Sequence, residues 1–197
     1  HTDFKDVIVI DNSNAGGRAD NGGEVVSKGL ELSTVYSPEN LLGVGDISFF
    51  ANYTFTNANL VGDASTDDSE SIFAGGRDGS NVPYIPEHVL SFGADYEINK
   101  FDFGINMTYH SETYGTAEET ETEEALGSAN IRAGKIDSAF LLNLRAGYKI
   151  NDNYRVITGV NNATDLQYIS SRHPNGIRAG APLQAYIKAV ANFDSLF

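Results

Sequence analysis

Residues 101–110, FDFGINMTYH, alternate in chemical character along their whole length. Each odd position holds an apolar residue, from Phe101 to Tyr109, and each even position holds a small or polar one, from Asp102 to His110. A period of two is typical of a β-strand with one apolar and one polar face. In a soluble β-sandwich the apolar face turns inward to a core. In a membrane β-barrel it turns outward to lipid, and the polar face lines the lumen.

The same alternation recurs in four further segments, residues 46–55, 90–98, 140–150 and 185–193. In the first of these Phe50 is an exception, because it falls among the polar positions. Weaker versions of the pattern lie around residues 2–10, 24–36 and 154–163. The chain is therefore expected to form about eight strands.

The connections between these segments are alternately short and long. The short ones are residues 37–45, 99–100 and 151–153, and the long ones are roughly 11–23, 61–82, 115–135 and 164–181, rich in Gly, Asn, Asp, Ser and Glu. Short turns at one end and long polar loops at the other are typical of an up-and-down meander, whereas Greek-key sandwiches mix their connection lengths differently.

Aromatic residues gather beside the short turns, on the apolar side of the pattern. They are Tyr36, Tyr96, Phe101, Tyr148, Tyr154 and Phe193. A ring of Tyr and Phe at one level is the girdle that barrels place at a membrane interface. A second ring toward the long loops is expected from Phe55, Tyr109, Phe140 and Tyr186. From Phe101 to Tyr109 a tilted strand spans roughly 20 Å, close to the ~25 Å apolar band of outer-membrane barrels. The alternation thus favours a membrane barrel, with a secreted β-sandwich as the other interpretation.

Composition narrows the possible functions. The chain of 197 residues has no Cys, and its 13 Lys and Arg stand against 27 Asp and Glu, for a formal net charge of -14. Such an acidic balance argues against binding nucleic acid, and the missing thiols exclude a disulfide framework within these residues. No apolar run approaches the ~20 residues of a transmembrane helix. Because the chain begins at His1 inside a strand-like pattern, we expect a fragment or the visible end of a longer chain.

Four segments resemble the C-terminal barrel region of TonB-dependent outer-membrane transporters, closest to ferric citrate and related siderophore receptors. They are GGEVVSKGLELSTVYSP (22–38), the segment from residue 76 to 97 with Pro83, Tyr84, Pro86 and His88, the segment from 143 to 169 with Gly159, Asn162, Asp165 and Tyr168, and GIRAGAPLQAYIKAVANF (176–193). The chain departs from the pattern at Leu183, where the family often has Arg, and in the DSLF that follows Phe193 and ends on Phe197.

The resemblance implies an all-β, antiparallel transmembrane barrel of about 22 strands, closed by an N-terminal plug. Residues 1–197 are then the C-terminal portion of the barrel domain, and the plug is not in this chain. It implies residence in the bacterial outer membrane beside lipid and lipopolysaccharide, uptake of a ferric chelate powered by the TonB complex, and no cofactor. The polar positions, full of Gly, Ser and Asn, agree with a wide barrel, because a closed eight-stranded barrel fills its interior with side chains.

Five basic residues in or beside the long loops are candidates for binding an anionic iron chelate: Arg77, Arg132, Arg172, His173 and Arg178. Arg suits this task because its planar guanidinium forks onto carboxylates. The alternative is that these residues pair with loop carboxylates. The other two histidines considered, His88 and His110, are expected to contact the barrel wall or the plug.

The acidic runs at residues 63–70 and 118–125 are interpreted as solvated loops, with a role in bridging divalent ions or lipopolysaccharide as the alternative. Neither run has the glycine-centred spacing of a calcium loop, so no metal site is predicted. No nucleophile, zinc or phosphate-loop motif indicates an enzyme. Two other functions stay open: a small, complete eight-stranded adhesion or structural barrel, and a TonB-dependent receptor for carbohydrate or cobalamin.

Overall fold

The computed structural model describes residues 2–4, 8–11, 18–21, 23–39, 41, 43, 45–64, 71–121, 132–173 and 176–192. The secondary structure in these residues is β-strand and turn. A helix of the length and apolarity needed to cross a bilayer does not occur among them.

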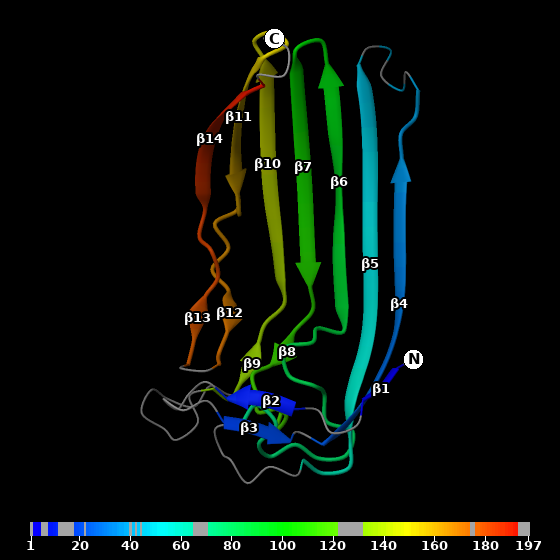
Figure 1. The fold of residues 1–197 in the computed structure, drawn as a ribbon, viewed down its shortest axis with the longest axis vertical. Coiled ribbons are helices and arrows are strands. Elements are labelled where there is room, and N and C mark those ends of the chain that lie inside the picture. Colours follow the sequence, from blue (N-terminus) through cyan, green and yellow to red (C-terminus); the bar gives the residue numbers. More distant parts are fainter. Residues whose placement is uncertain are drawn as a thin grey trace.

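One antiparallel sheet of eight strands forms the body of the protein (Figure 1). Its strands, in spatial order, are β1 (Thr2–Phe4), β4 (Glu24–Tyr36), β5 (Asp46–Val61), β6 (His88–Ile98), β7 (Phe101–His110), β10 (Ala139–Lys149), β11 (Tyr154–Asn161) and β14 (Gln184–Ala191). Spatial order follows chain order, so the predicted up-and-down meander is confirmed. Within the described residues the sheet stays open, with β1 and β14 at its edges.

Three short hairpins extend the sheet at the long-loop end, the lower end of Figure 1. They pair β2 (Ile8–Asp11) with β3 (Arg18–Asn21), β8 (Thr113–Tyr114) with β9 (Lys135–Ile136), and β12 (Ile169–Ser171) with β13 (Arg178–Ala179). The sequence predicts a single weak strand over residues 2–10. The structure instead has two separate short strands there, β1 in the sheet and β2 in a hairpin.

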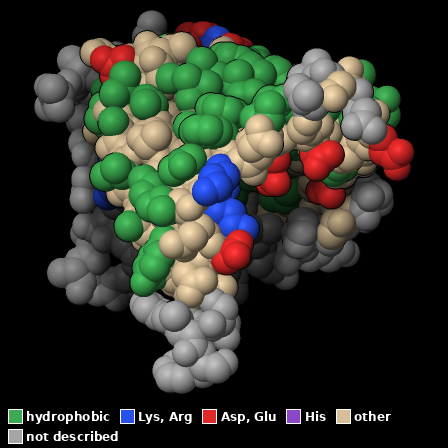
Figure 2. All heavy atoms as spheres, turned by 90° about the horizontal axis from the view of Figure 1, so that it is seen from above, with side chains coloured by type: hydrophobic (Ala, Val, Ile, Leu, Met, Phe, Trp, Pro, Cys, Tyr) green, Lys and Arg blue, Asp and Glu red, His purple; other side chains and the backbone are tan. Residues whose placement is uncertain are grey.

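The register of the central strands places like residues in rows across the sheet. Ile105 lies opposite Ala94 on β6 and Leu144 on β10, whereas Asn106 lies opposite Gly93 and Asn143. Adjacent residues of a strand point to opposite sides, so the rows form one apolar face and one polar face. Large side chains on the apolar face are exposed, for example Leu32 at 56% and Ile187 at 78%. Figure 2, seen from the short-turn end, shows hydrophobic side chains gathered over one side of the sheet.

Two aromatic residues lie on the polar face. Phe50 lies opposite Gly93, and Tyr186 lies opposite Gly159, where its ring occupies the space that a side chain at 159 would need. The prediction that Tyr186 joins the second aromatic ring is therefore wrong. On β14 the even positions belong to the polar face, and a glycine on β11 makes room there for the ring. Phe55, Tyr109 and Phe140 lie in rows of the apolar face toward the long loops.

Two of the short turns are stabilised by Asn. Ile98 and Phe101 are opposite each other, so Asn99 and Lys100 form a two-residue hairpin loop. Asn99 has a φ of 53°, a left-handed conformation that Asn tolerates better than most residues. In the next short turn the Asn151 side chain accepts hydrogen bonds from the N–H groups of Asn153 and Tyr154, both at 3.0 Å. These tight turns reverse the direction of the chain within two or three residues, and they set the register of the strands on either side.

A small core lies at the long-loop end, where loops cover the polar face. It is formed by Val25, Leu60, Phe73 and Ala117, all nearly inaccessible to solvent. The loops that supply Phe73 and Ala117 are therefore packed onto the ends of β4 and β5.

Candidate functional site

Four charged residues form a network across the polar face. Arg145 on β10 contacts Asp95 on β6 at 2.8 Å and Asp102 on β7 at 2.5 Å, and Arg155 on β11 contacts the second oxygen of Asp102 at 2.5 Å. The side chain of Asp102 is only 8% exposed, so its carboxylate contacts the two guanidinium groups rather than bulk water. Gly147 lies directly opposite Asp102, and a side chain there would occupy the place of the carboxylate. The network therefore links four strands.

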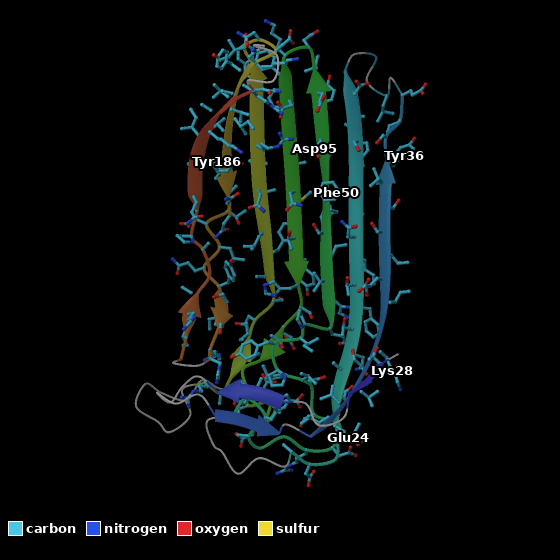
Figure 3. The ribbon with its side chains drawn as sticks, viewed as in Figure 1. Glu24, Lys28, Tyr36, Phe50, Asp95 and Tyr186 are labelled. Carbon is cyan, nitrogen blue, oxygen red and sulfur yellow. The ribbon has the colours of Figure 1, made fainter. Side chains whose placement is uncertain are left out.

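A groove of about 340 Å³ lies beside this network on the polar face. Phe50 and Tyr186 line it together with Asp95, Arg145 and a row of Asn residues, Asn106, Asn143 and Asn161. Figure 3 shows Phe50, Asp95 and Tyr186 on three different strands, in the half of the sheet nearer the short turns.

The amides of this groove bind one another. Asn143 donates to Asn106 at 3.3 Å, and its Oδ1 accepts the N–H of Asn162 at 3.0 Å. The network beside the groove is electrically balanced, with two Asp and two Arg. Such a polar, balanced surface suits the wall of a water-filled passage.

The predicted aromatic girdle has a consistent position. Tyr36, Tyr96, Phe101, Tyr148 and Tyr154 lie on the apolar face at the short-turn end, and the rings of Phe101 and Tyr148 are 4.9 Å apart. Phe193 and Phe197 lie outside the described residues. Whether these rings meet a membrane interface stays a prediction.

The five predicted ligand-binding residues separate into two groups. Arg77 and Arg178 are exposed and His173 is half-buried, whereas Arg132 and Arg172 are buried, at 8% and 1% exposure. Arg132 and Arg172 come together at Gly115, where a side chain would collide with the Arg132 carbonyl oxygen and approach Arg172 Cδ to 3.1 Å. Arg77 instead lines a separate cavity of about 690 Å³ with Asp63, Glu118 and Glu119.

Arg172 holds loops together. Its Nε and Nη2 donate to the carbonyl oxygen of Lys135 at 3.1 and 2.9 Å, and its backbone N–H donates to the hydroxyl oxygen of Tyr84 at 3.3 Å. Lys135 in turn binds Glu112 at 2.7 Å, and this hydrogen bond raises the pKa of the Lys135 ammonium. The predicted contact of Arg172 with a ligand stays a prediction, and it would have to coexist with these hydrogen bonds.

Tyr84 is one of the motif residues that carry the family resemblance, but the sequence analysis predicted no structural role for it. It has a φ of 64° and follows Pro83 within a turn, which is closed by a hydrogen bond from the N–H of Ile85 to the carbonyl of Val82 at 3.4 Å. Position i+2 of such a type II turn usually holds Gly or Asn. A bulky residue after Pro in a loop is the sequence signal that could have indicated this turn.

Burial raises the pKa of Tyr84 above its ordinary value of 10.0, although its hydrogen bond from the Arg172 N–H lowers it in part. The raised folded-state pKa means that any stability linked to this hydroxyl is complete below pH 10 and is lost as pH rises through the folded-state value. Tyrosinate absorbs at 295 nm, so the difference in absorbance between the wild type and Tyr84→Phe reports the ionisation of Tyr84. We expect this difference to develop only above pH 10. A difference signal that develops at or below pH 10 would contradict the burial of this hydroxyl.

The motif residues Asn162 and Asp165 build the start of the last long loop. Both have left-handed φ values, 48° and 52°. Asn162 is buried; its Nδ2 donates to the carbonyls of Leu166 and Ala181, and its Oδ1 accepts the N–H of Leu166. The Asp165 carboxylate accepts a hydrogen bond from the backbone N–H of Leu183 at 3.1 Å. Leu183 is the position where the family often has Arg.

The two other histidines and the acidic runs lie as follows. His88 is at the start of β6 on the apolar face, with Nδ1 at 2.9 Å from the Tyr53 hydroxyl, and His110 is at the end of β7, 6.5 Å from the Tyr168 ring. Glu119 accepts the N–H of Asn81 at 2.7 Å. Residues 65–70 and 122–125 of the acidic runs lie outside the described residues. Across the described part of the chain, no three His, Asp or Glu side chains are arranged to hold a metal ion.

Comparison with known proteins agrees with this architecture. Among solved structures, the ferric citrate transporter FecA superposes with a TM-score of 0.71 at 24% identity, over 92% of this chain and 26% of FecA. The siderophore receptor PiuA from Acinetobacter baumannii gives 0.66 at 19% identity, over 96% and 24%. The copper transporter OprC gives 0.64 at 16% identity, over 96% and 26%. The chain thus spans about a quarter of each, and at these identities the likeness shows the fold alone.

The sequence model of the family described as TonB dependent receptor-like, β-barrel, matches residues 1–163. This match covers most of the chain and includes β1 to β11 of the open sheet. The chain belongs to the TonB-dependent receptor β-barrel family, which resides in the bacterial outer membrane.

Proposed function

We propose that this chain is the C-terminal portion of the barrel of a TonB-dependent receptor that takes up a ferric chelate. The observation that carries the proposal is an open sheet whose outer face is apolar and whose inner face is polar and charge-balanced. Such a sheet suits part of the wall of a wide, water-filled barrel better than a small closed one. The remaining strands and the plug would come from the rest of the protein, and the TonB complex would act through that part.

Iron chelates suit the loop end better than neutral solutes do. Siderophore and citrate complexes carry carboxylate, catecholate or hydroxamate oxygens, and an exposed guanidinium binds such oxygens with two parallel hydrogen bonds. Arg77 and Arg178 are exposed there, and His173 follows β12, which is paired with the strand of Arg178. We propose these three as the direct contacts, with Arg132 and Arg172 acting from beneath. No chemical change of the ligand is proposed.

The membrane partners follow from the outer face. The apolar rows would contact lipid tails, and Lys28, exposed on β4 near the long-loop end, would meet lipopolysaccharide phosphates (Figure 3).

Binding by the full-length protein tests the assignment. Ferric citrate, a ferric catecholate, cobalamin and a maltooligosaccharide are titrated in parallel, and uptake is measured with and without TonB. We expect a ferric chelate to bind, and Arg77→Gln and Arg178→Gln each to weaken its binding roughly tenfold through a lost charge-assisted hydrogen bond. Lys149→Gln removes a positive charge at the opposite end of the sheet and should leave affinity unchanged.

Other outcomes would identify the alternatives. Binding of cobalamin or the oligosaccharide, without any ferric chelate, would assign the receptor to that ligand class. Uptake that persists without TonB would contradict transport by this mechanism.

A further inference from the structure

Three long loops meet at the outer end of the sheet, and we call their described residues the loop platform. They are the β5–β6 loop (62–87), the β7–β10 loop (111–138) and the β11–β14 loop (162–183). In Figure 1 the β8–β9 and β12–β13 hairpins of the last two loops lie near each other beneath the sheet. Loops that connect separate hairpins have no covalent reason to move together, so their mutual contacts decide whether they do.

The first and second loops are joined along their backbones. The N–H of Tyr84 donates to the carbonyl of Tyr114 at 3.2 Å, and the N–H of Ala117 donates to the carbonyl of Ile72 at 2.8 Å. Ala117 also packs with Phe73 in the small core. Separating these loops would expose both apolar side chains and paired backbone groups, which makes a joint motion cheaper than a separate one.

The third loop is attached through Arg172. This side chain is 1% exposed, and its guanidinium donates twice to the carbonyl of Lys135 in the second loop. The backbone N–H of the same residue donates to the Tyr84 hydroxyl in the first loop. A buried guanidinium requires its acceptors, because an unpaired one pays a large desolvation penalty. Arg172 therefore contacts both of the other loops from one position.

Tyr84 is the second half of this junction. Its backbone donates to the second loop and its hydroxyl accepts from the third, and it does so at a φ of 64°. A bulky non-glycine residue persists in that region only where surrounding contacts hold it. Its conformation is therefore evidence that the junction constrains the loops.

We propose that Tyr84 and Arg172 are positioning residues that hold the three loops as one preorganised unit. His173 follows Arg172 directly, and Arg178 lies on the strand paired with β12. The unit thereby presents these basic side chains at fixed positions to an anionic ligand, which reduces the ordering cost of binding. The claim that the unit binds an anionic ligand rests on the proposed function. The mechanical claim, that the three loops move as one unit, does not.

Amide hydrogen exchange of the full-length protein in detergent tests the mechanical part. Tyr84→Phe removes only the hydroxyl, and Arg172→Met removes the guanidinium. The matched control is Tyr114→Phe, whose hydroxyl donates to Glu121 within its own loop at 3.0 Å. Barrel folding of each variant is verified by its heat-modifiable gel mobility.

We expect both junction variants to speed exchange in all three loops together, by roughly tenfold for a lost buried hydrogen bond. The residues probed are 81–85 in the first loop, 113–117 and 132–136 in the second, and 169–173 in the third. The control should leave residues 169–173 at the wild-type rate. If Tyr84→Phe speeds exchange in a single loop or in none, the loops are independent and the proposal is wrong. That variant retains its aromatic ring, so it decides the question even if Arg172→Met fails to fold.

The affinity for ferric citrate then separates the two proposals. Tyr84→Phe should weaken binding while speeding exchange, and Arg178→Gln should weaken binding with exchange unchanged. If exchange in the three loops is coupled but the wild type does not bind ferric citrate, the proposal of a loop platform stands and ferric citrate is rejected as the ligand. Unchanged affinity in a Tyr84→Phe variant with faster exchange would reject the positioning role.

Discussion

Asp102→Leu is expected to destabilise the folded barrel by about 1.5–3 kcal/mol, the usual contribution of hydrogen bonds to a charged group, because the two guanidinium groups left behind still reach water. The change leaves Arg145 and Arg155 without the carboxylate that both contact, on a face where Asp102 itself is almost inaccessible. Asp95 still binds Arg145, so the greater loss falls on Arg155. The measurement is the urea unfolding midpoint of the full-length protein in lipid vesicles, followed by circular dichroism.

Two variants control for this effect. Asp102→Asn retains the shape of the side chain but removes its charge, so it should lose part of the stability. Asp152→Ala removes a carboxylate that contacts Lys149 at 3.0 Å in an exposed turn, and it should leave the midpoint unchanged at neutral pH. Lys149 lowers the pKa of Asp152, so any contribution from this pair is present at neutral pH and disappears as pH falls. If Asp102→Leu unfolds at the same midpoint as Asp152→Ala, the network does not stabilise the sheet.

Ile105→Arg is expected to cost about 2–4 kcal/mol, because it places a charge in lipid near the bilayer midplane. Ile105 lies in the middle of β7, in the apolar row that continues through Leu144 to Val160. The measurement is the same unfolding midpoint in vesicles. Tyr36→Arg, close to a short turn, should cost only about 0–1 kcal/mol, because the cost falls toward the interface.

Asn161→Arg is the matched control for Ile105→Arg, because it introduces the same charge on the polar face of the sheet. Asn161 follows Val160, which is in the row of Ile105 and Leu144, and it lies on the polar, groove-lining side. An arginine there reaches water and should change the midpoint little. If both arginines cost the same, the apolar face does not contact lipid, and the assignment of inside and outside is wrong.

The strands and their two faces were predictable from the sequence, because adjacent residues of an extended chain point to opposite sides. A segment such as residues 101–110 therefore assigns its own faces without reference to any partner. The order of the strands was predictable as well, since two- or three-residue connections such as 99–100 and 151–153 permit only neighbouring antiparallel strands.

The site was predictable only in part, because a loop sequence does not state what the loop contacts. Arg77 and Arg172 look alike in sequence, yet one is exposed and the other is enclosed by two loops from distant parts of the chain. Tyr186 was misplaced for a related reason. Its position depends on a glycine that strand pairing brings opposite it.

The sequence by itself thus determined what each strand offers to lipid and to water, since that choice is local and repeats every second residue. Only the tertiary structure decided which side chains meet. The junction of Tyr84 with Arg172 and the pairing of Asp102 with Arg145 join residues 88 and 43 positions apart. Their energies come from burial and charge, which arise only once the strands have assembled.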